Sequence, residues 1–171
     1  TKGLLSFGKP TAKRKEIVMP NFILSEIAKV VSQTFPSNIS LEEKIDEKLH
    51  NILGNGTEIY QILLNLCVNA KESIERKGKI ILGASNIKVD DSNIISYPLL
   101  DRGKYVNFFV SDSGSGIDEE NISKIFDPYF STKQKDTGSG LGLYVTYGII
   151  KAHNGHVDVT SQKGIGTRFD V

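Results

Sequence analysis

The strongest folding signal in the chain is one continuous amphipathic segment, Glu58-Ile59-Tyr60-Gln61-Ile62-Leu63-Leu64-Asn65-Leu66-Cys67-Val68-Asn69-Ala70. At about 100° per residue, its apolar side chains and that of Ile74 fall on one helical face. These are Ile59, Ile62, Leu63, Leu66, Ala70 and Ile74. A turn precedes the segment at Gly54-Asn55-Gly56, and Thr57 is placed to cap a helix. We therefore expect a long helix from Thr57 to about Lys77, buried along one side.

Polar side chains follow the margin of this buried face. They are Glu58, Gln61, Asn65, Asn69 and Glu72. Asparagine has a low helix propensity, so two asparagines one turn apart slightly lower the stability of the helix. Two interpretations stay open for the helix taken alone. It is either a solvated helix edge, or a row of amide oxygens that serve as neutral ligands to Mg²⁺ alongside phosphate oxygens and water.

The rest of the chain mixes helices and strands. Periodicity and turn residues predict helices over 21–35 and 141–153, and strands over 39–45, 79–87, 104–112, 156–161 and 167–171. Neighbouring strands resemble hairpins more than βαβ units. This favours an α+β fold, a two-layer sandwich of helices on a mixed, mostly antiparallel sheet. We expect residues 1–16 to be the end of a preceding helix and a linker, and residues 17–171 to be one domain.

The composition, net charge and hydropathy of the chain argue against several classes of protein. The 171 residues are 39% hydrophobic and 24% charged, with a net charge of +1, so neither nucleic acid nor an anionic membrane is expected as a partner. The single cysteine, Cys67, is expected in the core and fits a reducing, cytoplasmic environment. No apolar run approaches the roughly 18 residues of a membrane span, and no signal peptide is apparent. Because the chain starts at Thr1, we expect a soluble piece of a longer protein.

A second cluster, Asp112-Ser113-Gly114-Ser115-Gly116-Ile117, follows an apolar strand. A carboxylate at a strand end can accept a hydrogen bond from an exocyclic amine, and glycines let the backbone approach a flat ring. Taken alone, a tight Asp-Ser-Gly turn explains the same residues.

Two further clusters flank a polar stretch. The first is Phe126-Asp127-Pro128-Tyr129-Phe130-Ser131-Thr132-Lys133, whose aromatics suit a small packed cluster and whose end suits a mobile flap. The second is Gly138-Ser139-Gly140-Leu141-Gly142-Leu143, which opens a helix and suits an anion site. The glycine spacing matches neither the P-loop nor the dinucleotide fingerprint. Each cluster, taken alone, is weak evidence for a function.

In this order, the clusters resemble the histidine-kinase branch of the superfamily shared by gyrase, Hsp90, histidine kinases and MutL. Residues 65–70 are similar to its N box, 112–116 to its G1 box, 126–133 to its F box and 138–143 to its G2 box. Gly164-Ile165-Gly166-Thr167 is similar to its terminal glycine motif. The resemblance covers about residues 20–171 and implies the Bergerat-type ATP-binding fold.

The resemblance also implies roles. The ligand would be ATP or ADP with Mg²⁺: Asp112 would bind the adenine amine, Asn69 the metal, and Asn65 would assist at the metal or phosphates. Lys133 would reach the γ-phosphate, which with Asn65 and Asn69 completes the implied catalytic group. The remaining implied nucleotide contacts are Gly114, Gly116, Ile117, Phe130, Thr137, Gly138, Ser139, Gly140, Leu141, Gly142, Leu143 and Thr167. The lid would span about 131–140.

Two positions refine the implied activity. Relatives that attack with water or serine have a glutamate base where this chain has Asn65, so a histidine acceptor is favoured. Many histidine kinases have a phosphate-binding lysine where this chain has Glu72, so Lys133 or the lid would have to compensate. The expected enzyme is a protein-histidine kinase, a phosphoryl transferase of a two-component system.

The phosphoacceptor itself is expected upstream, because none of the three histidines (His50, His153, His156) matches the family's acceptor motif. The implied partners are the protein's own dimerisation domain and a response regulator receiver domain, with the parent protein a homodimer. Membrane anchoring of the parent and the oligomeric state of this chain stay open. A stand-alone ATPase or serine kinase of the same fold, and a domain that only binds nucleotide to gate an interaction, are the alternatives.

Overall fold

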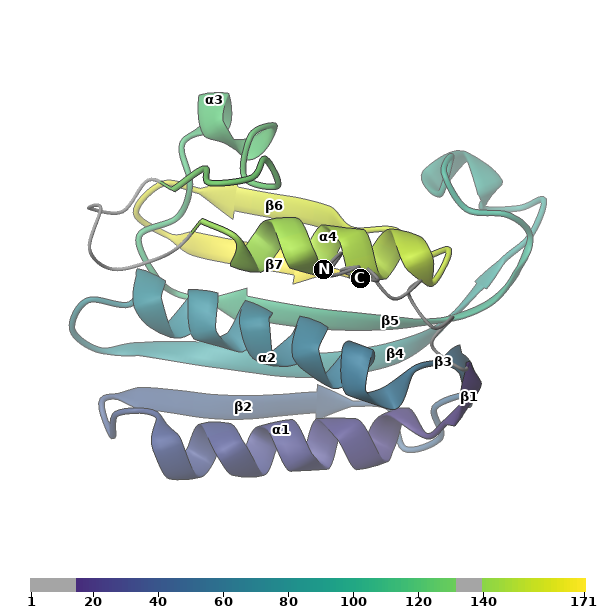
Figure 1. The fold of residues 1–171 in the computed structure, drawn as a ribbon, viewed down its shortest axis with the longest axis horizontal. Coiled ribbons are helices and arrows are strands. Elements are labelled where there is room, and N and C mark those ends of the chain that lie inside the picture. The colour runs from purple at the N-terminus through teal and green to yellow at the C-terminus, as the bar shows by residue number, and fades with distance from the viewer. Residues whose placement is uncertain (1–14, 132–139) are drawn as a thin grey trace, which may run out of the picture.

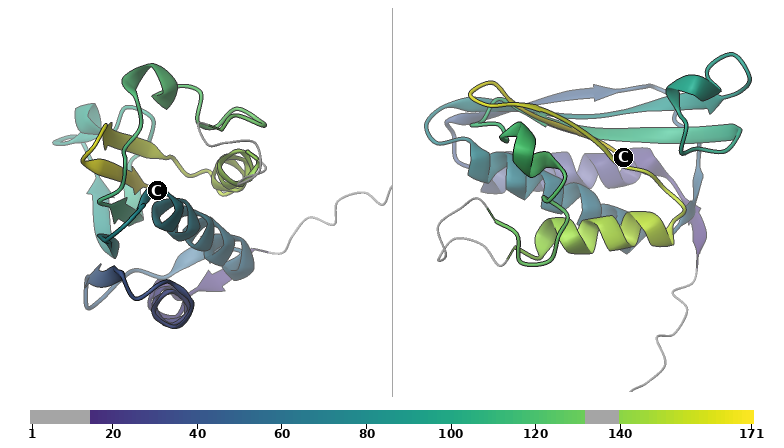
Figure 2. Two further views of the ribbon diagram at one scale, coloured as in Figure 1. Left: turned by 90° about the vertical axis from the view of Figure 1, so that its left-hand side faces the viewer. Right: turned by 90° about the horizontal axis from the view of Figure 1, so that it is seen from above.

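A computed structural model describes residues 15–131 and 140–171. A five-stranded sheet in the order β2-β4-β5-β7-β6 carries three helices, α1, α2 and α4, on one face (Figures 1 and 2). The strands of this sheet are β2 (Ile39–Ile45), β4 (Gly78–Val89), β5 (Gly103–Asp112), β6 (Asp158–Gln162) and β7 (Gly166–Asp170). The helices are α1 (Pro20–Thr34), α2 (Gly56–Ser73) and α4 (Gly142–Ala152), with the short α3 (Glu119–Ile122) beyond the sheet edge.

The strand pairing confirms the mixed, mostly antiparallel sheet expected from the sequence. The strands β2 and β4 are parallel, whereas β4–β5, β5–β7 and β6–β7 are antiparallel. The β4–β5 pair is the longest, running from Ile80 opposite Asp112 to Val89 opposite Gly103. This register fixes Asp112 at one end of the sheet and the β4–β5 connection at the other.

The core lies between the helices and the sheet. All six residues of the predicted apolar face of α2 are buried, and they pack in one cluster with Leu24 and Ile27 of α1 and with Ile80 and Leu82 of β4. Cys67 is fully buried, as predicted, and burial raises the pKa of its thiol to about 12. The predicted two-layer α+β architecture is therefore confirmed.

Both ends of α2 differ from the prediction. Asn55, not Thr57, caps the helix, because its extended backbone lets its side chain accept a hydrogen bond from the Glu58 amide at 3.0 Å. The helix ends at Ser73 rather than near Lys77, since Ile74 turns to an extended conformation and the Ser73 carbonyl accepts from the Ser115 amide at 2.9 Å.

Short elements were not predicted. Strands β1 (Glu16–Val18) and β3 (Ile52–Gly54) form a separate antiparallel ribbon, and η1 (Ile94–Ser96) lies in the β4–β5 connection. Three residues are too few to show alternation, and the ribbon is held to the core through buried Val18. Within the described residues, no helix is both long and apolar enough to span a bilayer.

Candidate functional site

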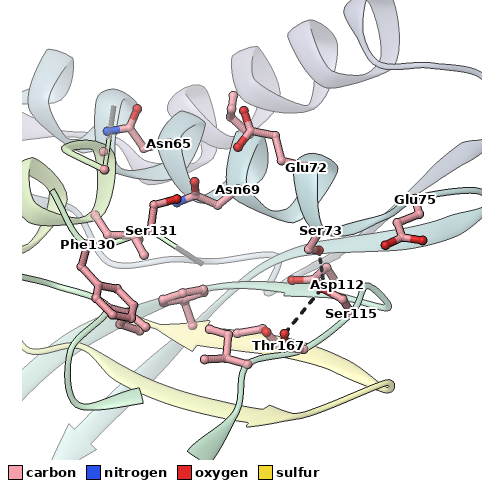
Figure 3. Close-up of a pocket in the computed structure, with 18 residues that line it drawn as sticks. Asn65, Asn69, Glu72, Ser73, Glu75, Asp112, Ser115, Phe130, Ser131 and Thr167 are labelled. Atoms are coloured by element: carbon pink, nitrogen blue, oxygen red, sulfur yellow. Dashed lines mark hydrogen bonds between the residues drawn. The ribbon is translucent and has the colours of Figure 1, made fainter. Parts of the chain in front are cut away.

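A cavity of about 500 Å³ opens between α2, the ends of β5 and β7, and the start of α4 (Figure 3). Its volume lies within the range of small-molecule sites. The residues that line it are Asn65, Val68, Asn69, Glu72, Ser73, Glu75, Asp112, Ser115, Gly116, Ile117, Ile125, Phe130, Ser131, Gly140, Gly142, Leu143, Thr167 and Phe169. Segments far apart in the sequence therefore meet at one hollow.

Most of the expected site residues lie in this lining. They are Asn65, Asn69, Asp112, Gly116, Ile117, Phe130, Gly140, Gly142, Leu143 and Thr167. Gly114 and Leu141 are adjacent in sequence to the lining but are not part of it. Lys133, Thr137, Gly138 and Ser139 lie outside the described residues, as does most of the expected lid.

Several lining residues were given no role from the sequence, among them Ser73, Glu75, Ser115, Ile125 and Phe169. Helical spacing could have found Ser73, because it follows Asn69 by one turn on α2. Phe169 gives no local signal, since it reaches the cavity only through the pairing of β7 with β5.

The two asparagines extend from α2 toward the cavity (Figure 3). The Asn65 Nδ2 donates to the Thr146 hydroxyl of α4 at 3.2 Å. The Asn69 Nδ2 is buried and has no partner among the described atoms. A buried amide is normally satisfied, so the Asn69 amide suits a site that a ligand completes, with its oxygen on a cation and its N–H on a phosphate oxygen.

The Asp112 turn, residues 112–116, closes the other side. The Asp112 Oδ1 accepts from the Gly114 amide and from the Ser73 hydroxyl, both at 2.8 Å. The tight Asp-Ser-Gly turn expected from the sequence is therefore present, and it also places a carboxylate at the cavity wall. Below it, the buried Thr167 shares a 2.8 Å hydrogen bond with Ser161.

The N-terminus of α4 forms the third side. Its N-cap residue, Leu141, makes no side-chain cap, and no acidic residue lies in its first turn, so this helix end suits an anion. Just before it, Gly140 has a φ of 65°, and a Cβ there would lie 2.7 Å from the Tyr129 backbone. The Tyr129 amide donates to the Gly140 carbonyl at 3.1 Å. This hydrogen bond joins the aromatic segment that ends at Ser131 to the glycine segment that resumes at Gly140.

The negative charges of the described lining favour an anionic ligand that binds together with a cation. Glu72, Glu75 and Asp112 contribute carboxylates, and no Lys or Arg occurs among the described lining residues. No group of three His, Cys, Asp or Glu side chains within 15–131 and 140–171 is arranged for a metal. A metal here would be held by amide oxygen and by the ligand's own phosphates, which suits Mg²⁺.

The three histidines lie away from the cavity, and two of them contact neighbouring residues of the fold. The His153 Nε2 accepts from the Asn55 amide at 3.0 Å, which joins the end of α4 to the start of α2. The His153 Nδ1 lies 2.9 Å from the Ile149 carbonyl of α4 itself, so both ring nitrogens have partners. His156 pairs with Asp158 at 3.1 Å, and His50 is exposed in a connection. None of the three lines the cavity.

A hollow of this size, with a carboxylate turn at one end and a helix N-terminus at the other, places the chain in the class of nucleotide-binding α+β domains. The chain belongs to the family of histidine kinase-, DNA gyrase B- and HSP90-like ATPases, whose model matches residues 54–171.

Its curated relatives are sensor kinases. CckA of Brucella abortus (strain 2308) is 32% identical over 168 residues, and the sensor histidine kinase ZraS of Escherichia coli (strain K12) is 34% identical over 167 residues. These matches cover 98% and 97% of this chain but 18% and 32% of the relatives. The chain therefore spans about a fifth to a third of the relatives' length.

Solved structures give the same fold. Full-length ShkA in complex with AMPPNP matches with a TM-score of 0.72 and 27% identity, covering 91% of this chain and 30% of that one. The nucleotide-free catalytic domain of the histidine kinase ThkA matches with a TM-score of 0.72 and 26% identity, covering 92% and 93%. The fold is that of a histidine kinase catalytic domain.

Proposed function

We propose that the chain is the ATP-binding catalytic part of a two-component sensor histidine kinase. It transfers the γ-phosphoryl group of Mg-ATP to a histidine on a dimerisation domain, for relay to an aspartate of a response regulator. The observation that carries the proposal is the meeting of the α2 asparagines, the Asp112 turn and the α4 N-terminus in one cavity. The proposed location is the cytoplasm, the compartment that supplies ATP.

Each side of the cavity has a distinct task. Asp112 accepts a hydrogen bond from the adenine amine and so sets which end of the nucleotide points inward. The α4 amides from Gly142 onward receive the phosphate tail. The Asn69 oxygen would hold Mg²⁺, which supplies the positive charge that the described lining lacks. Phosphoryl transfer depends mainly on positioning and charge neutralisation, and this arrangement supports both.

The identity of residue 65 favours a histidine acceptor. An amide cannot take a proton from water or serine, and the Asn65 Nδ2 is already bonded to Thr146. A neutral imidazole is a nucleophile without deprotonation. The stand-alone ATPase remains a rival only if the isolated chain turns over ATP steadily.

The outer face of α4 supports docking of the acceptor domain. Tyr144, Val145 and Tyr147 are large and exposed, on a helix whose N-terminus borders the cavity. A helix with apolar residues on its solvent side is suited to a protein partner. We assign this face to the helix that carries the acceptor histidine.

Calorimetry with Mg-ATP tests the nucleotide site. The Asp112→Ala and Asn69→Ala variants should each lose at least tenfold in affinity, while Asp158→Ala, outside the cavity, should bind as the wild type does. Unchanged affinity in both site variants would refute the assignment. Transfer is tested by adding the parent protein's dimerisation domain with labelled ATP: the histidine-linked phosphate should appear only with both parts present, and steady phosphate release by this chain alone would support the ATPase instead.

A further inference from the structure

Ser73 joins the last turn of α2 to the Asp112 turn. Its carbonyl accepts from the Ser115 amide at 2.9 Å, and its hydroxyl oxygen lies 2.8 Å from the Asp112 Oδ1. The same hydroxyl lies 2.8 Å from the Ala70 carbonyl. Figure 3 shows Ser73 and Asp112 next to each other at one end of the cavity, joined by the hydrogen bond between them. A hydroxyl has one proton, and a carboxylate attracts it more strongly than an amide carbonyl does.

Gly114 provides the space for this contact. A Cβ on Gly114 would lie 2.0 Å from the Ser73 Oγ and 2.6 Å from the Ser73 Cβ. Gly114 itself does not line the cavity. The absence of a side chain at Gly114 is thus explained by the seating of Ser73 against the turn, and direct contact with a nucleotide is not needed to explain it.

Two of the hydrogen bonds that Asp112 accepts restrict the orientation of its carboxylate. The terminal torsion of an aspartate side chain is broad, so each hydrogen bond to the carboxylate narrows the orientations it can take. The Gly114 amide and the Ser73 hydroxyl bond the same oxygen from two different elements. Together they restrict the plane of the carboxylate relative to the cavity.

We propose that Ser73 is a positioning residue for base recognition: its hydroxyl holds the Asp112 carboxylate in the orientation that receives the adenine amino group. The inference rests on the proposed function, because it takes adenine as the base. It assigns to Ser73 a share of the selectivity for 6-aminopurine nucleotides over purines without that amine.

The test compares two nucleotides on three variants. The probes are Mg-ATP and the Mg complex of purine riboside triphosphate, which lacks the 6-amino group, and calorimetry gives both dissociation constants. Ser73→Ala should weaken ATP about tenfold and leave the analogue unchanged, because one charge-assisted hydrogen bond to the recognising group is lost. Ser73→Thr keeps the hydroxyl and should restore the preference for ATP. Ser25→Ala is the matched control, since Ser25 makes the same type of bond to the carbonyl three residues back, 2.8 Å from Phe22 on α1.

The outcomes separate the inference from the proposed function. Equal weakening of both nucleotides in Ser73→Ala would mean that Ser73 only stabilises the fold, which overturns the inference. Unchanged ATP affinity in Ser73→Ala, with a loss in Asp112→Ala, overturns it too and leaves the proposed function intact. Unchanged ATP affinity in Asp112→Ala would also overturn the inference, and the proposed function would fall with it only if Asn69→Ala binds ATP unchanged too. The ratio of the two dissociation constants in Ser73→Ala is decisive by itself. The test therefore remains valid if the Ser73→Thr variant does not fold.

Discussion

At the scale of single residues, Glu72 is the side chain whose charge opposes the ligand. It is exposed on α2 at the cavity, three residues after Asn69, and is one of three carboxylates in the described lining. Replacing it by lysine changes the local charge by two units near the expected phosphates. We predict that Glu72→Lys binds ATP roughly fivefold more tightly at low salt and depends less on Mg²⁺, as a surface charge interaction of about 1 kcal/mol implies.

The Glu72 prediction is checked by calorimetry with ATP, with and without Mg²⁺. Glu26→Lys on α1 is the control, because it makes the same change in net charge away from the cavity lining. Equal tightening in both variants would show a general charge effect and contradict a role for position 72.

Cys67 gives a residue-scale prediction for pH. Burial raises the pKa of its thiol from an ordinary value of 9.0 to about 12, so the folded state keeps it protonated where the unfolded state does not. Its contribution to the free energy of unfolding is therefore complete below pH 9 and is lost between about pH 9 and 12. Iodoacetamide at pH 8.5 should label Cys67 in urea but not in the native chain, as mass spectrometry would show. Native labelling at the rate of the unfolded chain would contradict this burial.

At the scale of elements, one hydrogen bond joins α2 to α4 beneath the site. Thr146 is fully buried on α4 and accepts from Asn65 at 3.2 Å. Thr146→Val keeps the shape but leaves the Asn65 N–H without its acceptor. We predict a loss of about 1–2 kcal/mol in the free energy of unfolding and slower phosphoryl transfer, because Asn65 is no longer held.

Thr146→Ser is the matched variant. It keeps the hydroxyl but removes a methyl group, so it loses a comparable stability through packing. Urea unfolding and transfer assays on both variants separate the two effects. Transfer that is slow in Thr146→Ser and normal in Thr146→Val would contradict the role given to the hydroxyl.

The elements also show what the sequence could and could not predict. Periodicity located α1, α2 and α4 and the five strands of the sheet, because their length lets burial repeat along them. The ribbon of β1 and β3 was missed, since its strands have three residues each. At the site, asparagine and glycine motifs gave local signals, and helical spacing from Asn69 offered one for Ser73. Phe169 became a site residue only through the pairing of β7 with β5.

At the scale of the whole molecule, the cavity lies where the layers meet. Its walls come from α2, β5, β7 and α4, whereas α1 and β2 contribute no residue to the described lining. The β4–β5 connection, residues 90–102, lies at the opposite end of β5 from Asp112 (Figure 1). A ligand in the cavity therefore bridges several elements and leaves one end of the sheet untouched.

Hydrogen exchange measures this bridging. Mg-ATP at 100 times its dissociation constant should slow exchange by up to about 100-fold wherever local opening breaks the site. The amides of Gly114 and Ser115, which bond Asp112 and Ser73, belong to this group. Amides of residues 90–102 that open without disturbing the cavity should exchange at the same rate with and without ligand. Protection at 90–102 without protection at the Asp112 turn would place the nucleotide at the wrong end of the sheet and contradict the assigned cavity.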